Sequence, residues 1–397
     1  MPTLDAHPTL HVTLSGDVFL KSRRTQQQLI KRARANLDEA LAKAGYGGPV
    51  ARIGTHRFSL SPEQESLPAV RAAALTVFGI GSVDAVVEQA FVTFDELAAV
   101  IAAHSAERVT GHTFAARVKR RGTHTWTSVD LARAIGSFLV EAGGTVDLTN
   151  PEVSVDVTVL DDRAFIVIDH RKGSGGLPIG TQDRVLCLIS GGFDSVVAAW
   201  MLMSRGCTVD FVHFSLNCAQ SDHALAVARE LWGTWGHGMK PTVHLVEFQP
   251  VKDALYEHVD SRMRQVTLKV MMAKAASEIA EADGISALVT GDAMGQVSSQ
   301  TLPHLVAVSR AVDTPILRPL LGLPKESIID LARRVGTAEL SARAREVCDL
   351  SEGGPVATSA STRAVDTTVT AIPEHVLTDV VSTAKVFSLA DWTPGQL

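Results

Sequence analysis

The segment 184–207, RVLCLISGGFDSVVAAWMLMSRGC, joins a strand to a helix through two glycines. Its first apolar run is typical of a buried strand and ends at residues 190–192, Ser-Gly-Gly, and a helical pattern starts at Asp194 and Ser195. Such a joint is either an ordinary turn or a phosphate cradle. A cradle needs convergent backbone N–H groups, glycines that permit close approach, and a helix N-terminus behind them. This joint supplies all three.

The C-terminal half repeats the alternation of apolar strands with helices. The predicted strands are RVLCLI, TVDFVHFSL, TVHLVEF, SALVTG and TPILRPL. This pattern is typical of a parallel sheet covered on both faces. Ligands of such sheets bind beyond the carboxyl ends of the strands, where Ser190, Asn217, Thr290 and Gly291 are expected.

The first ninety residues predict a small ferredoxin-like α+β domain. The expected elements are a strand at 11–18, a basic amphipathic helix at 23–41, a strand at 49–61, and a helix that leads into a strand at 66–86. The first 60 residues carry nine Lys and Arg against four Asp and Glu, although the whole chain has a net charge of −6. A basic segment on an acidic body favours local contact with a polyanion.

A second α/β unit follows. A helix at 93–107 is expected to begin at an N-cap Thr93 with Glu96 in a capping box, and a later helix at Ser128. Strands are predicted at 111–128, 153–160 and 163–170, and residues 171–182 are Gly-rich and predict a linker. We therefore expect three domains, at 1–68, 69–170 and 171–397.

Composition restricts the class of protein. The chain has 397 residues, of which 46% are apolar, and no run is long enough to span a membrane. Its start lacks the pattern of a secretory signal. Four cysteines show no metal-binding spacing, which favours a reducing cytoplasm.

The motif S-G-G-F-D-S at 190–195 lacks the layout of a Walker-type phosphate loop. It is the signature of the pyrophosphatase-loop ATPases, which cleave ATP between its α and β phosphates. Three further motifs follow it along the chain: RMRQVTLKVMMAKAA, LVTGDAMGQVSSQTLPHL and ILRPLLGLPKESIIDLARRVGT. Together they resemble the tRNA 4-thiouridine synthetase (tRNA uracil 4-sulfurtransferase) family. The segments 113–136 and 146–159 are similar to the RNA-binding THUMP domain of that family, and 16–29 to the ferredoxin-like domain before it.

The resemblance implies an adenine nucleotide alpha-hydrolase-like fold for the catalytic domain, ATP and Mg²⁺ as cofactors, and tRNA as substrate. It implies that a uridine, position 8 of tRNA in the family, is adenylated on O4 and then receives sulfur from a persulfide. The implied nucleotide-binding residues are Leu188, Ile189, Ser190, Gly191, Gly192, Ser195, Lys269, Gly291 and Gln300. Asp194 is expected to orient the loop or the magnesium, and Lys325 to stabilise the charge on the developing pyrophosphate. No bound metal site of the protein's own is expected. Taken singly, Lys269 and Lys325 also fit solvated helix positions.

The family places its sulfur-carrying cysteine at Cys348, and a cysteine desulfurase would supply the sulfur. Cys187 and Cys207 fit buried apolar positions instead. Some members end in a rhodanese domain, and others bind an iron–sulfur cluster through cysteines near the helix of Lys269. The sequence after Leu350 is too short for the first and the helix lacks cysteine, so we expect neither. Cys218 is then a candidate resolving thiol.

Basic residues alternate along the strand at 111–128. Arg117, Lys119, Arg120 and Arg121 predict a stripe that binds RNA phosphates, with His124 and Trp126 nearby. The helix at 23–41 adds five further Lys and Arg.

Other functions remain open at this point. One is a different adenylating pyrophosphatase-loop enzyme, such as an amidotransferase or another tRNA thiolase. Another is a non-catalytic tRNA-binding protein. The family also implies a possible homodimer and sulfur supply for the thiazole of thiamine.

Overall fold

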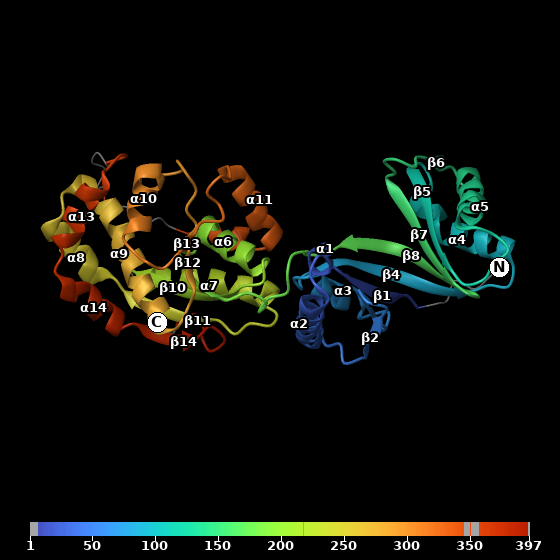
Figure 1. Cartoon of the computed structure of the whole chain (residues 1–397), viewed down its shortest axis with the longest axis horizontal. Coiled ribbons are helices and arrows are strands. Elements are labelled where there is room, and N and C mark those ends of the chain that lie inside the picture. Colours follow the sequence, from blue (N-terminus) through green and yellow to red (C-terminus); the bar gives the residue numbers. More distant parts are fainter. Residues whose placement is uncertain (1–6, 217, 345–349, 351–356, 396–397) are drawn as a thin grey trace. The chain divides into compact units, whose positions relative to one another are not determined.

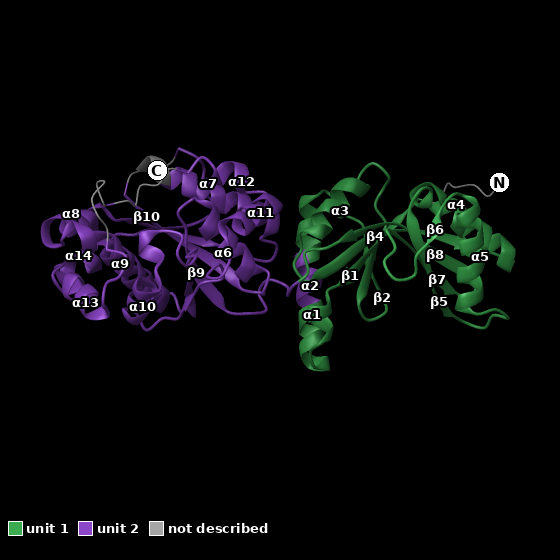
Figure 2. Ribbon diagram, turned by 90° about the horizontal axis from the view of Figure 1, so that it is seen from above, with its two compact units in different colours: residues 1–30, 37–175 green, residues 31–36, 176–397 purple. Residues whose placement is uncertain are grey.

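The computed structural model describes residues 7–216, 218–344, 350 and 357–395, and its strands form two separate sheets (Figure 1). The chain divides into two compact units, one of residues 1–30 and 37–175 and the other of residues 31–36 and 176–397 (Figure 2). The predicted boundaries at 68 and 170 stay predictions, since this division concerns two units and not three domains.

The first unit holds an eight-stranded sheet in the order β2-β3-β1-β4-β8-β7-β5-β6. Its elements are β1 Thr9–Leu14, α1 Gly16–Phe19, α2 Arg23–Lys43, β2 Val50–Ile53, β3 Arg57–Leu60, α3 Leu67–Leu75, β4 Ile80–Ala90, α4 Phe94–Val109, β5 Thr113–Arg121, α5 Ser128–Glu141, β6 Thr145–Val146, β7 Val153–Leu160 and β8 Arg163–Lys172. Residues 31–36 in the middle of α2 are the exception, because they belong to the second unit. Strand β4 is antiparallel to β1 on one side and to β8 on the other, so the ferredoxin-like part and the second part share one continuous sheet.

The second half of this sheet has its own apolar core. Helices α4 and α5 pack against each other, and their buried residues Ile101 and Leu131 join Phe114 of β5 and Val157 of β7 in one cluster. Burial of large apolar side chains on one face of strands and helices is the main driving force for such a layer.

Three local expectations for this unit are wrong because glycine-containing turns interrupt the strand pattern. The strand predicted at 111–128 ends at Arg121, before Gly122 with a φ of +101°. The strand that starts near His11 ends at Leu14, and helix α1 begins at Gly16. The segment 49–61 is a hairpin of β2 and β3, turned at Gly54 with a φ of +62°. Glycine adopts this left-handed conformation without steric cost.

Helix caps follow the sequence closely. Thr93 is the N-cap of α4 and accepts a hydrogen bond from the Glu96 N–H, as predicted. The predicted capping box is wrong, because the Glu96 carboxylate accepts from the Val92 N–H instead of the Thr93 N–H. The second helix is capped one residue earlier than Ser128: Thr127 and Asp130 form a complete capping box. The Asp130 carboxylate reaches the Thr127 N–H, a contact that a cap at Ser128 would lose.

The second unit holds a six-stranded sheet in the order β13-β12-β9-β10-β11-β14. Its elements are β9 Arg184–Leu188, α6 Phe193–Met203, β10 Thr208–Ser215, α7 Cys218–Trp235, β11 Thr242–Glu247, α8 Gln249–His258, α9 Ser261–Ala282, β12 Ala287–Val289, η1 Ser298–Gln300, α10 Leu302–Arg310, β13 Ile316–Leu317, α11 Lys325–Val335, α12 Ala338–Ser341, α13 Thr362–Thr370, α14 Glu374–Ser382 and β14 Lys385–Ser388. The five predicted strands are all present and pair in parallel.

Helices cover both faces of this sheet (Figure 1). Helix α6 packs with α7 and α11, while α9 packs with α8 and α14, and both α6 and α9 contact β9 and β12. Strand β10 is buried along almost its whole length, as expected for a parallel strand between two helical layers.

The C-terminal segment adds two helices and an edge strand to this unit. Helix α13 is capped by Ser361, and its Val365 packs into an apolar cluster with Val266 and Val270 of α9. Helix α14 ends at Ser382, and β14 pairs antiparallel with β11. The strand covers a sheet edge that would otherwise expose unpaired backbone groups.

Candidate nucleotide and RNA sites

The strand order of the second unit reverses at β9. From β9 the chain proceeds to β10 and β11 on one side, and later to β12 and β13 on the other. In open α/β sheets, the crevice beyond the carboxyl ends of the strands at such a switch point binds the ligand. The loops after β9 and β12 both lie there.

The loop after β9 is built around two glycines. Gly191 has a φ of +80°, and a Cβ at this position would lie 2.7 Å from a ring carbon of His223. Gly192 is the N-cap of α6, so the free N–H groups of the first helical turn open onto the loop. Ser195 is buried, and its Oγ accepts a hydrogen bond from the Ser190 N–H at 3.3 Å. Its hydroxyl therefore braces the loop.

Side chains from two other segments contact the carboxylate of Asp194, in the first turn of α6. The Nζ of Lys325, the first residue of α11, lies 2.8 Å from Oδ1 and 3.0 Å from Oδ2. The Gln296 amide donates to Oδ2 at 3.1 Å from the segment between β12 and η1. The sequence motifs predict Asp194 and Lys325 at one site but not their direct contact, and they do not single out Gln296.

Gly291, directly after Thr290 and β12, packs against the first turn of α6. A Cβ here would lie 2.6 Å from the Asp194 carbonyl carbon and 2.6 Å from the Ser195 nitrogen. The expected reason for this glycine was close approach of its backbone to adenosine. The described structure gives a second reason, the close approach of two protein segments.

The segment after β12 is held by a partly buried ion pair. The Arg318 Nε donates to Asp292 Oδ2 at 3.2 Å, and Thr290 Oγ1 donates to the same oxygen at 2.7 Å. The Arg318 Nη1 reaches Ser309 Oγ in α10 at 2.8 Å. Because a planar guanidinium donates in fixed directions, this contact ties β13, α10 and the β12 loop together.

The other predicted nucleotide residues lie on elements at this edge of the sheet. Leu188 ends β9, Ile189 follows it and is buried, and Gln300 ends η1, where its Oε1 is buried with no hydrogen-bond partner among the described residues. Lys269 is half-buried in α9.

His213 of β10 was missed by sequence analysis. Its Nδ1 lies 2.8 Å from the Ile189 carbonyl oxygen, and burial lowers the pKa of this imidazole. The ring is therefore neutral, and Nδ1–H donates to the carbonyl at the start of the glycine loop. The signal that could have found it is its place one strand away from Ile189, near the carboxyl end of β10.

Two cysteines are buried thiols, as expected. Cys187 lies inside β9, where burial raises the pKa of its thiol to about 12. Burial also raises the pKa of Cys207, helped by the negative charge of Asp183. Since the thiolate is the nucleophile, neither is suited to sulfur transfer. Cys348 lies outside the described residues, and the side chain of Cys218, the first residue of α7, is not described.

The predicted RNA-binding stripe on β5 separates into two sets. Arg117, Lys119 and Arg121 are exposed at alternate positions and share one face. Arg120 is half-buried: its Nη1 lies 3.2 Å from His124 Nδ1, and its guanidinium lies 5.7 Å from the Trp126 ring centre. Arg120 thus packs on the aromatic side, and the stripe on the open face has three cations instead of four.

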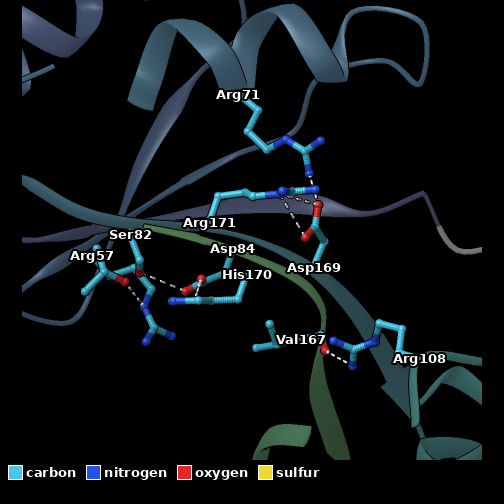
Figure 3. Close-up of polar contacts among 10 residues, drawn as sticks. Arg57, Arg71, Ser82, Asp84, Arg108, Val167, Asp169, His170 and Arg171 are labelled. Atoms are coloured by element: carbon cyan, nitrogen blue, oxygen red, sulfur yellow. Dashed lines mark hydrogen bonds and ion pairs between the residues drawn. The ribbon is translucent and has the colours of Figure 1, made fainter. Parts of the chain in front are cut away.

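A second polar group surrounds β4 and β8 in the first unit (Figure 3). Arg71 of α3 and Arg171 both contact the Asp169 carboxylate, and His170 Nδ1 lies 2.6 Å from Asp84 Oδ1. Arg171 was expected to begin the linker, but β8 continues to Lys172. These contacts hold α3 and β4 to β8 and neutralise much of the local charge.

One of the five cations predicted on helix α2 has a structural role. The Arg32 guanidinium donates to the backbone carbonyl oxygens of Ile179 at 2.7 Å and Gly238 at 2.6 Å, all within the second unit. The Arg32 guanidinium therefore uses these N–H groups to bind the protein's own backbone instead of RNA phosphates. In the described part of the chain, no helix combines the length and apolar composition that a membrane crossing requires.

The doubly wound sheet, with a glycine loop opening α6 at its switch point, defines a nucleotide-binding protein of the pyrophosphatase-loop class. Two family models match the chain: "Thiamine biosynthesis protein (ThiI)" over residues 180–376 and the THUMP domain over residues 91–169. The chain belongs to the tRNA sulfurtransferase family.

Curated relatives support this assignment, and solved structures share the fold. The chain is 39% identical over 344 residues to a tRNA sulfurtransferase of Desulfurococcus amylolyticus, covering 86% of this chain and 70% of the relative. It is 36% identical over 387 residues to that of Klebsiella pneumoniae strain 342, covering 96% and 79%. A crystal structure of a 4-thiouridine synthetase–RNA complex with bound ATP has the same fold, with a TM-score of 0.79 at 21% identity, over 96% of this chain and 99% of that one. PH1313 from Pyrococcus horikoshii matches with a TM-score of 0.59 at 18% identity, over 83% and 99%.

Proposed function

We propose that the chain is an ATP-dependent tRNA uracil 4-sulfurtransferase that converts uridine 8 of tRNA to 4-thiouridine. The observation that carries the proposal is the glycine loop that opens α6 with Asp194 and Lys325 beside it, in a chain that also has a THUMP domain. The names of the curated relatives support it, as does the solved 4-thiouridine synthetase, which holds both RNA and ATP.

The first stage is activation of the uracil. The carbonyl oxygen O4 is a poor leaving group, and attack of O4 on the α phosphorus of ATP converts it into AMP, a good one, with release of pyrophosphate. Backbone N–H groups at residues 190–192 and the N-terminus of α6 would bind the phosphates. Lys325 would stabilise the charge that develops on pyrophosphate.

Magnesium fits the oxygen donors of this site. Mg²⁺ is bound in such enzymes by one or two carboxylates together with phosphate oxygens. Asp194 provides a carboxylate at the mouth of the loop, so Asp194 is the residue that would hold the ion. When bound, Mg²⁺ neutralises phosphate charge.

The second stage is sulfur transfer. A cysteine desulfurase would load Cys348 with a persulfide, whose outer sulfur attacks C4 and displaces AMP. The remaining sulfur–sulfur bond would be cleaved by a second thiol, which leaves the thiouridine and a protein disulfide. Cys218, at the start of α7 on the ligand side of the sheet, is the proposed resolving thiol.

The remaining assignments are proposals of the same kind. The first unit would bind tRNA through Arg117, Lys119 and Arg121. The enzyme would act in the cytoplasm as a monomer or homodimer. The persulfide would also supply sulfur for thiazole synthesis. Leu188, Ile189, Lys269 and Gln300 would contact the adenosine or its phosphates.

The test is a reconstituted reaction. Purified protein, unmodified tRNA, ATP, cysteine and a desulfurase should yield tRNA with thiouridine absorbance. Cys348→Ser should lose this product at least a hundredfold while its affinities for ATP and tRNA stay within twofold, because the thiol acts only in the second stage.

Cys207→Ala, which changes a buried thiol, is the matched control and should retain thiolation. Full turnover by the Cys348→Ser protein would refute the role of that residue. Absence of tRNA-dependent ATP–pyrophosphate exchange in the unaltered protein would favour a non-catalytic tRNA-binding protein.

A further inference from the structure

The carboxylate of Asp194 has two kinds of partner. Lys325 contacts both oxygens but its side chain is 41% exposed, against 24% for Asp194. Exposed ion pairs are weak, because water and salt screen them and the lysine chain loses freedom on pairing. The proposed function requires Lys325 to contact the phosphates of ATP. Its ammonium group then either leaves the Asp194 carboxylate or contacts both the carboxylate and the phosphates.

Gln296 holds the same carboxylate from a segment whose backbone is hydrogen-bonded on both sides of it. The Gly295 N–H donates to the Gln300 carbonyl at 2.9 Å, and the Gln300 N–H donates to the Val297 carbonyl at 2.9 Å. Met294 donates to the Leu321 carbonyl at 3.1 Å. The backbone on both sides of Gln296 is therefore fixed, which limits the positions available to its side chain.

The orientation of the Gln296 amide follows from its partner. A carboxylate only accepts hydrogen bonds, so the nitrogen must face Asp194 Oδ2, as the 3.1 Å contact has it. The amide is neutral, so it fixes one oxygen without cancelling the negative charge that attracts a cation. A lysine in the same place would compete with magnesium.

We propose that Gln296 is a positioning residue that holds Asp194 in its metal-binding orientation and links it to the Gly291–Gln300 segment. This inference rests on the proposed function, because it assigns Asp194 to Mg²⁺ in the ATP complex. Gln296 acts through Asp194.

The test measures ATP binding by calorimetry across a series of Mg²⁺ concentrations. Gln296→Ala should weaken binding of Mg²⁺-ATP and raise the half-saturating Mg²⁺ concentration, each about tenfold, since hydrogen bonds to charged groups are among the stronger ones. The tRNA affinity and the midpoint of thermal unfolding should be unchanged. Gln249→Ala is the matched control: the Gln249 amide donates to Asp253 Oδ1 at 2.7 Å on the exposed side of α8, and its loss should alter none of these values.

A double-mutant cycle separates positioning from general damage. In the Asp194→Asn background, Gln296→Ala should weaken ATP binding less than twofold, because the carboxylate it holds is gone. An unchanged Mg²⁺ requirement in Gln296→Ala would overturn the inference, whatever the second background shows, and so would an equal loss in both backgrounds. Failure of the unaltered protein to bind ATP at all would instead refute the proposed function.

Discussion

At the scale of single residues, the nucleotide site depends on a position where only glycine, which has no Cβ, can be accommodated. Gly291 lacks the Cβ that would collide with the first turn of α6. The sequence marked this glycine as a ligand contact, and the packing of two protein segments could not be inferred from it. Whether Gly291 also contacts nucleotide stays a prediction.

Gly291→Ala should weaken ATP binding about tenfold and destabilise the second unit by about 1–3 kcal/mol, because the added methyl meets backbone atoms that cannot rotate away. Calorimetry and urea unfolding measure the two effects. Gly233→Ala in α7 is the control: no atom lies within 4 Å of its new Cβ, so we expect ATP binding to stay unchanged. ATP affinity and stability of Gly291→Ala equal to those of the unaltered protein would contradict this account.

At the scale of the element, strand β5 shows what alternation predicts and what it leaves undecided. Side chains of a strand alternate between its two faces, and Arg117, Lys119 and Arg121 do share one face of β5. The same alternation puts Arg120 on the opposite face, so the prediction of one stripe with all four cations is wrong for Arg120. The contacts of Arg120 with His124 and Trp126 depend on the turn after β5, which local pattern does not determine.

Replacing Arg117, Lys119 and Arg121 together by alanine should weaken tRNA binding. It should also reduce the magnitude of the slope of log K against log salt concentration by about two to three, since each phosphate contact releases counterions. Arg120→Ala should leave that slope nearly unchanged and lower the unfolding midpoint of the first unit. Filter binding from 50 to 300 mM salt and thermal unfolding distinguish the two variants. Equal salt slopes for the triple variant and the unaltered protein would exclude the stripe as a phosphate site.

At the scale of the whole molecule, the first unit has a built-in acid sensitivity. His11 of β1 is buried, and desolvation, together with the charge of Arg57, lowers its pKa from 6.5 to about 4. Between these values the unfolded chain binds a proton that the folded chain does not. Stability is therefore complete above pH 6.5 and falls as the pH drops towards 4.

His11→Gln should remove this dependence. We expect the unaltered protein to lose about 2 kcal/mol of stability between pH 7.5 and pH 5 relative to the variant, from the linkage of protons to unfolding. Hydrogen exchange of the β1 amides, compared between the two proteins at each pH, measures the difference. An identical pH dependence in both would show that His11 titrates alike in the folded and unfolded chain.

The sequence by itself determined the parallel strands of the second unit, the glycine loop that opens α6, the capped helix α4 and the family, because these depend on local periodicity and on contiguous motifs. Tertiary structure alone decided that β4 unites two halves of one sheet, that β14 closes an edge, and that Lys325 and Gln296 meet Asp194. The reason is physical. Gln296 and Lys325 lie 102 and 131 positions after Asp194 along the chain, and they come close to it only when the strands pair and the helices bury their apolar faces. No local pattern encodes that approach.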